Sequence, residues 1–363
     1  MSQHLTLRRW DETTWLAEGE RWQALLKASG CDPLFLSWQW QTLWWRHFSK
    51  SIGGELCLYA GYSGSELVGL APFYLSSAKR RCIPVRSAQL IGSSWLKSEP
   101  AFSEYLDVIA LPTFAHQFRR QVLEQIQRAH EPNEIVVGNT RKATTWLDIL
   151  SDLPARSHYM RRVDELISYQ ADLTDGMQPY LKWLGASTRR AFWHKRHRLE
   201  EAGPVKLEVV ERANTRSAFE DLNRLRALRW GEPVFYGEVM DFHEAFASGL
   251  AADAELMITR LWVGDRLASV LYDAVKGTTQ YNIQLGFDPA FLHGASLGLL
   301  HFGYALEQAV ARGITRYDFL AGTGKTSNYK KHLAQHSSEL ISLQTLIGQP
   351  VTQLYRLYDW WSR

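Results

Sequence analysis

The sequence predicts an α/β fold with mixed sheets that is built twice along the chain. Two glycine-turn hairpins have matching patterns, and a helical segment and then a short apolar segment follow each of them. The hairpin segments read GSELVGLAPFYL and GDRLASVLYDAV, each a turn followed by a strand that begins with a leucine. Such a run can also arise by chance in an α/β chain. Because the order of elements agrees over about 100 residues, we interpret it as an internal duplication.

The first half is predicted as helix, hairpin, strand, helix and strand. Its helical periodicity is clearest in the aromatic segment LFLSWQWQTLWWRHF. The predicted elements are a helix over 34–48, strands over 56–59 and 67–74 around the turn 61–64, a strand over 105–110, a helix over 114–129 and a buried strand over 135–137.

The second half repeats that order. The predicted elements are a helix over 219–230, strands over 256–263 and 267–275 across the turn 264–266, a strand over 279–287, a helix over 296–312 and a strand over 316–320. These elements predict an N-terminal half at 1–170, a basic helical connector at 171–205 and a C-terminal half at 206–363. In the connector, STRRAFWHKRHRL carries five Lys/Arg residues between Arg189 and Arg198. A solvated face, a contact to an anionic ligand and a contact to RNA are all compatible with it.

Composition narrows the class of protein. The 363 residues are 45% hydrophobic and 22% charged, with a net charge of +3, so the chain is globular and not built for DNA. Three cysteines without a CxxC pair and an N-terminus without an apolar segment predict a cytoplasmic protein. No apolar run is long enough to predict a transmembrane segment. His194 and His197 lack ligand spacing, so we expect no metal.

A loop of small residues is the strongest candidate for ligand binding. The strand 279–287 ends at Asp288-Pro289, and the loop then leads into the helix 296–312. The unpaired backbone N–H groups and the dipole of a helix start favour a pyrophosphate. The loop residues are Gly294, Ala295, Ser296, Leu297 and Gly298, although glycines before a helix also serve ordinary turns.

The chain resembles the GNAT superfamily, specifically the FemAB-like group with the CelD-type acetyltransferases associated with bacterial exopolysaccharide synthesis. The resemblance covers residues 34–335 and lies in FLSWQWQTLWWRHF, LVGLAPFYL, EYLDVIA, STRRAFWHKRHRL and LGFDPAFLHGASLGLLHFGYALEQAVARGITRYDFLAGTGKTSNYKKHL. The usual acyl-CoA loop of the superfamily reads Gln/Arg-x-x-Gly-x-Gly/Ala, whereas this loop reads HGASLG. The first half lacks a glycine loop, so we expect the cofactor in the C-terminal half.

The resemblance implies an acyltransferase, acting with acetyl-CoA or another acyl-CoA on an amine or hydroxyl of a sugar or polysaccharide precursor. A splayed backbone N–H around Ile283, Gln284 and Leu285 would face the thioester carbonyl. Tyr329 would be the acid for the leaving thiolate, Lys330 would contact the cofactor, and Asp318 would be a base or a substrate orienter. The plain alternatives are an aromatic on a helix face for Tyr329 and a locally bonded carboxylate for Asp318.

A cleft between the halves is the expected place for the acceptor. The candidate acceptor residues are Trp38, Trp44, Tyr105, Asp107, Arg229 and Tyr281, with core packing as the alternative for Trp38 and Trp44. Two other functions remain open. One is a FemAB-like transferase that takes aminoacyl groups from charged tRNA, supported by the basic segment but weakened by the mild net charge. The other is a non-catalytic accessory protein of exopolysaccharide synthesis that docks through the aromatic C-terminus.

Overall fold

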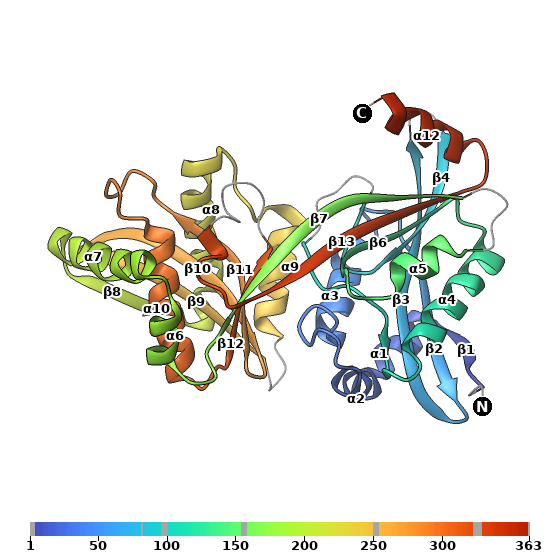
Figure 1. The fold of residues 1–363 in the computed structure, drawn as a ribbon, viewed down its shortest axis with the longest axis horizontal. Helices are drawn as coiled ribbons and strands as arrows, with labels where there is room; N and C mark the ends of the chain where they lie inside the picture. Colours follow the sequence, from blue (N-terminus) through green and yellow to red (C-terminus); the bar gives the residue numbers. More distant parts are fainter. Residues whose placement is uncertain are drawn as a thin grey trace. The chain divides into compact units, whose positions relative to one another are not determined.

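The computed structural model describes residues 4–80, 83–95, 101–153, 158–249, 254–321 and 329–361. The chain forms two compact units, which are described separately (Figure 1). Unit 1 consists of residues 1–166 and 339–363, and unit 2 consists of residues 167–338. In the described ranges, every helix is too short or too polar to cross a membrane.

Unit 1 is built on a mixed sheet whose strands follow one path. Their order is β1 (Thr6–Trp10), β2 (Glu55–Ser63), β3 (Glu66–Arg80), β4 (Ile83–Leu90), β6 (Glu134–Arg141) and β13 (His336–Ile347). The only parallel pair along this path is β4 with β6. A short strand, β5 (Ile109–Ala110), pairs with β3. Only these two residues of the strand predicted over 105–110 pair in the sheet. Tyr105 has a positive φ of 56°, and the Val108 N–H donates to the Asp107 carboxylate and not to a neighbouring strand.

Unit 2 repeats this topology strand for strand. Its order is β8 (Val205–Val209), β9 (Ala254–Val263), β10 (Arg266–Lys276), β11 (Thr279–Phe287), β12 (Arg316–Ala321) and β7 (His158–Asp172), whose first residues, 158–166, belong to unit 1. Here too a single pair, β11 with β12, is parallel and the other neighbours are antiparallel. The predicted mixed α/β fold with two tandem halves is therefore confirmed.

The last strand of each sheet comes from outside the contiguous half. β7 follows the unit 1 elements along the chain but pairs with β12, with Tyr317 opposite Ala171. β13 follows the unit 2 elements but pairs with β6, with Gln344 opposite Val136. The units therefore differ from the contiguous boundaries predicted at 170/171 and 205/206. Local periodicity marks where a strand lies, whereas the choice of sheet depends on long-range pairing.

Helices cover both faces of the unit 2 sheet (Figure 1). One side carries α6 (Met177–Trp183), α7 (Ala186–Ala202) and α10 (Leu297–Ala311); the other carries α8 (Thr215–Trp230) and α9 (Gly237–Ser248), with a 3₁₀ turn at Arg212–Asn214 before α8. Alternation along β10 separates the two cores, since Leu271 packs with α10 and Val270 with α8. Gly303 of α10 lies under Phe192 of α7, where a Cβ would come within 2.8 Å of the ring.

Large aromatic side chains form a substantial part of the unit 1 core. Its helices are α1 (Glu12–Ala17), α2 (Gly19–Ser29), α3 (Trp38–Phe48), α4 (Ala115–His130), α5 (Trp146–Ser151) and α12 (Val351–Trp361). Trp15, Trp22, Trp40, Trp44 and Trp146 are fully buried. Many of the 15 tryptophans thus stabilise the fold by burying large apolar surface.

Candidate functional site

Two parallel strands of unit 2 separate part-way along their length. β11 pairs with β12 at only three positions, the last being Tyr281 opposite Asp318, yet β11 continues to Phe287. A register shift between β10 and β11 leaves Ile283 as an extra residue, which is a β-bulge. Beyond it, the Leu285 N–H donates to the side-chain Oε1 of Gln284 (3.1 Å). Residues 283–285, where we expected a splayed backbone N–H, thus lie in the opening between β11 and β12, beyond their last paired position.

Helix α10 begins beside the separated end of β11. The Ala295 N–H donates to Leu292 O (3.1 Å), whereas the N–H groups of Leu297, Gly298 and Leu299 meet no acceptor among the described residues. A Cβ on Gly298 would lie 3.1 Å from Leu285 Cδ2, so a larger residue there would require the Leu285 side chain to shift. The helix start therefore presents unsatisfied donors next to the opening.

Two cations of α7 contact the loop before α10. Lys195 Nζ donates to Ser296 Oγ (2.6 Å), and Arg198 Nη2 donates to His293 O (3.1 Å). Burial first, and then the nearby Arg198 guanidinium, lowers the pKa of Lys195 below its usual value. Ser296 has φ 53° and does not cap the helix through its side chain, because its hydroxyl instead accepts from Lys195. The helix dipole and two positive charges thus act on the same spot.

Tyr329 lies on the same side of the sheet as α10. Its ring packs against Phe302, with centroids 6.1 Å apart. Burial raises the pKa of Tyr329 to about 12, while the charge of Arg229 acts in the opposite direction. The Tyr329 hydroxyl therefore stays protonated near neutral pH and can donate a hydrogen bond.

A pair of arginines lies at the end of α8. The guanidinium groups of Arg226 and Arg229 stack on Trp230, 4.0 and 4.2 Å from its ring centroid. Arg229 also lies 4.7 Å from the Phe287 ring centroid. Among the described residues, neither arginine forms an ion pair, and Arg226 Nε is buried without a hydrogen-bond partner. Arg224, on the same helix, is paired with Asp221. This end of α8 thus carries two arginines without an ion pair among the described residues, although the nearby Glu232 carboxylate acts on the pKa of Arg226.

Asp318 and Lys330 are engaged by the protein itself. The Asp318 carboxylate accepts from Ser168 Oγ (3.0 Å), Gln170 Nε2 (3.0 Å) and Leu320 N (2.8 Å). Lys330 Nζ donates to the carbonyls of the last three residues of β12, at 2.6, 3.1 and 3.2 Å. Both side chains therefore fix the end of β12, and the locally bonded interpretation of Asp318 describes its geometry.

In unit 1 the equivalent opening is filled by the chain. β4 and β6 also pair at three positions only. Leu106 N–H donates to Asn139 O of β6 (3.2 Å), and Asn139 Nδ2 donates to Ser103 O (3.0 Å). Leu106 also lies against Gly92, just after β4, where a Cβ would come within 2.7 Å of it. The segment around Tyr105, which is 2% exposed, thus occupies the space between the two strand ends.

Three acceptor candidates of unit 1 have roles within the core. Trp44 is fully buried and donates to Ala101 O (3.1 Å). Asp107 accepts two hydrogen bonds from Arg119 of α4, at 3.0 and 2.5 Å, and a third from Trp146 Nε1 (2.7 Å). Tyr105 lies under the Arg141 guanidinium. Core packing and ion pairing describe these residues better than exposed stacking does.

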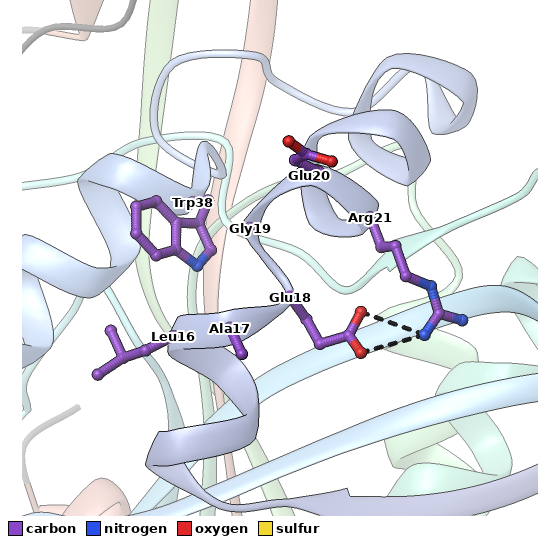
Figure 2. A pocket seen from close by; sticks show the side chains of 7 residues that line it. All are labelled: Leu16, Ala17, Glu18, Gly19, Glu20, Arg21 and Trp38. Carbon is purple, nitrogen blue, oxygen red and sulfur yellow. Dashed lines mark hydrogen bonds and ion pairs between the residues drawn. The ribbon is translucent and has the colours of Figure 1, made fainter.

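The other two predicted aromatics differ in exposure. Trp38 is half-buried beside a hollow of about 410 Å³ where α1 meets α2, and its Nε1 donates to Trp15 O (3.1 Å). Figure 2 shows its indole facing Gly19, with the Glu18–Arg21 ion pair at the other end of the hollow. Tyr281 is buried at the last paired position of β11.

Sequence reasoning missed specific residues that the fold brings to the site. Lys195 and Arg198 were noted only as part of a basic segment, although their spacing of three places both on one helix face. His301 of α10 was not singled out; it is buried between Ser269 Oγ (2.7 Å) and Thr259 Oγ1 (2.8 Å). Ser269 donates to Gly286 O, so its hydroxyl accepts from His301 Nδ1–H, and Nε2 accepts from Thr259. A neutral imidazole therefore fastens α10 to the sheet.

Comparison with known proteins identifies the class. Residues 186–331 match the family model described as "Acetyltransferase (GNAT) domain". The fold is similar to "Crystal structure of FemX" (TM-score 0.63, 14% identity, 96% of this chain and 99% of that chain). It is also similar to a tandem GNAT protein from the clavulanic acid biosynthesis pathway (0.51, 12%, 96% and 100%) and to L-PGS from Bacillus licheniformis (0.51, 11%, 92% and 94%). No curated protein sequence matches the chain. Residues 186–331 are thus similar to a GNAT acetyltransferase domain, which supports an acyltransferase.

Proposed function

We propose that unit 2 binds acyl-CoA at the start of α10 and passes the acyl group to an amine or hydroxyl. One observation carries the proposal: β11 and β12 separate where three unsatisfied amides of α10 and two cations of α7 meet. This combination suits a diphosphate, because the amides supply directional donors and the cations supply charge. The residues that would hold it are Gly294–Gly298, Lys195 and Arg198.

The contrast with unit 1 supports a single cofactor site. There the chain's own segment around Leu106 bonds Asn139 in the equivalent opening, and α4 begins after Leu111-Pro112 without a glycine loop. A pantetheine arm would have to displace buried residues. We therefore place the cofactor in unit 2 only.

The bound thioester would supply the acyl group, and the residues around it would stabilise charge. If the Gln284 side chain moves away, the Leu285 N–H becomes available to a developing oxyanion. Tyr329, held protonated by its raised pKa, would donate a hydrogen bond to the departing sulfur. We assign positioning roles to Lys330 and Asp318, because both side chains hold the end of β12 in place. Tyr329 directly precedes Lys330 in the chain.

For the acceptor we propose a sugar or a cell-envelope polysaccharide precursor, acylated in the cytoplasm, where acyl-CoA is made. We place the acceptor at the end of α8, beside Arg226, Arg229 and Trp230. Arg229 lies over Phe287 at the end of β11, and its charge acts to lower the pKa of Tyr329. A stacked indole beside two unpaired cations suits a sugar that carries an anionic group. The CelD-type assignment and exopolysaccharide synthesis belong to this proposal.

The test is titration calorimetry with acetyl-CoA, followed by release of free CoA thiol with a panel of amino sugars and nucleotide sugars. We expect acetyl-CoA to bind and at least one acceptor to accelerate thiol release. Absence of binding to every acyl-CoA tried would refute the acyl-CoA proposal.

Transfer of an aminoacyl group from charged tRNA is the second candidate, and the basic helix α7 is the observation that favours it. Part of the positive charge of α7 is already engaged within the protein. Arg189 donates to the Leu181 carbonyl, and Arg196 pairs with Glu307. Lys195 and Arg198 face the α10 loop, which leaves mainly Arg190 outward. The remaining charge is small for an RNA backbone. A salt-sensitive mobility shift with charged tRNA, and no binding of acyl-CoA, would favour this second candidate.

A further inference from the structure

On helix α12, the Asp359 carboxylate faces the protein and the indoles of Trp360 and Trp361 face solvent. Asp359 forms a two-point ion pair with Arg161 of β7 (both distances 2.6 Å) and accepts from the Tyr159 hydroxyl (2.8 Å). Trp360 and Trp361 are 77% and 85% exposed, and Leu357 is 65% exposed. A surface helix of an isolated globular protein normally has the reverse arrangement.

The exposed side chains form one patch. Leu357, Trp360 and Trp361 are spaced at i, i+3 and i+4, so they are neighbours on a single helix face. The opposite face is fixed, since Val351 is buried and Tyr355 packs with Val85 of β4. The patch is therefore a preformed surface on a clamped helix, and the helix cannot turn it inward without breaking the Arg161–Asp359 pair.

Two exposed cations lie on α12 and on the hairpin against which it packs. Lys79 is exposed on β3, opposite Pro84 in the hairpin whose Ile83 and Val85 pack with α12. Arg356 is exposed on α12 itself. The arginines of β7 and β4 contribute less, because Arg161, Arg162 and Arg86 pair with Asp359, Glu165 and Glu55. Figure 1 shows α12 beside β4 in unit 1.

We propose that this face, the α12 patch, attaches the protein to an anionic phospholipid surface. Indoles favour the boundary between headgroups and acyl chains, and lysine and arginine beside them attract anionic lipid. The attachment is peripheral: the helix lies along the surface and stays clamped to unit 1. It is independent of the proposed acyl-CoA site, which lies in unit 2.

Co-sedimentation with vesicles tests the proposal, using phosphatidylcholine alone and a mixture of phosphatidylcholine with phosphatidylglycerol. We expect binding to the mixed vesicles that weakens with salt, and at least about a tenfold loss of partitioning in the double variant Trp360→Ser/Trp361→Ser. Trp183→Ser is the matched control, because Trp183 is also exposed (47%) but lies on α6. Lys79→Glu should weaken binding to the mixed vesicles only.

Three outcomes would overturn the proposal. The wild type could stay in the supernatant with both vesicle types, or the double variant could bind as the wild type does. Sedimentation velocity without lipid could also show a dimer that the double variant abolishes, which would assign the patch to a second copy of the chain. Thermal unfolding of the double variant should match the wild type, since the replaced side chains are exposed.

Discussion

Removing the two α7 cations at the α10 loop should weaken acyl-CoA binding strongly. Lys195 and Arg198 are only partly buried, so each contributes less than a fully buried charge would. At about 1 kcal/mol for each half-exposed charged contact, the variant Lys195→Ala/Arg198→Ala loses about 2 kcal/mol, which is about a 30-fold rise in Kd.

Titration calorimetry with acetyl-CoA at low and high salt measures this change. The difference in Kd for acetyl-CoA between the wild type and the double variant should become smaller as salt rises, because salt screens the electrostatic contribution that the variant has lost. S-acetylpantetheine, which lacks the phosphates, should bind the two proteins equally. Arg190→Ala is the control, since Arg190 is exposed on the same helix.

A change in Kd of less than about threefold would refute the assignment of the phosphates to this loop. An equal loss of affinity for S-acetylpantetheine would also refute it, because the cations would then be supporting the loop and not contacting phosphate. Thermal unfolding checks that the double variant is folded. Its unfolding temperature should be close to that of the wild type, because partly exposed charges contribute little to stability.

Three further predictions concern catalysis, the unit 1 core and pH. Tyr329→Phe should lower kcat by at least about tenfold and leave the KM for acetyl-CoA unchanged, as measured by thiol release. Asp107→Ala should destabilise the protein by about 3–5 kcal/mol in urea unfolding, because it leaves the Arg119 charge buried and unpaired. His301 has its pKa lowered to about 3 by burial, so the fold favours the neutral ring and loses stability as pH falls below the unfolded value of 6.5. Between about pH 7 and pH 5, the free energy of unfolding of the wild type should fall by about 2 kcal/mol more than that of His301→Asn.

Each of these has an outcome that contradicts it. An unchanged kcat would remove Tyr329 from the chemistry. Arg120→Ala, which breaks an exposed pair with Glu124, should cost less than about 1 kcal/mol, and an equal cost for Asp107→Ala would show that burial does not matter there. Parallel stability curves for the wild type and His301→Asn would show that the imidazole titrates normally in the folded protein.

The sequence predicted regular elements best where an apolar period was long and clearly bounded. The strand 279–287 is predicted at the bounds that β11 has, and the helices 219–230 and 296–312 lie within a few residues of α8 and α10. Elements with mixed patterns were missed, among them β7, whose exposed and half-buried residues do not alternate cleanly. A strand of that kind is specified by its partners and not by its own hydrophobic pattern.

The candidate site could be predicted only in part for the same reason. A glycine-containing loop between a strand and a helix is a local pattern, so residues 294–298 could be found from the sequence. The cations that contact it come from α7, about 100 residues earlier along the chain, and no local pattern pairs them with the loop. Asp107 shows the opposite error: a carboxylate near aromatics suggested a ligand contact, whereas Arg119 and Trp146 use it in the core.

The sequence by itself determined the duplicated order of elements and the position of the glycine-containing loop before α10, because turns, periodicity and helix starts depend on neighbouring residues. Only the tertiary structure decided that β7 and β13 complete the sheets of the other sequence half and that the chain's own segment fills the opening in unit 1. Those outcomes depend on pairings between residues up to about 200 positions apart, such as Asn139 with Ser342. Their stability comes from long-range packing and hydrogen bonds, which a local pattern does not contain.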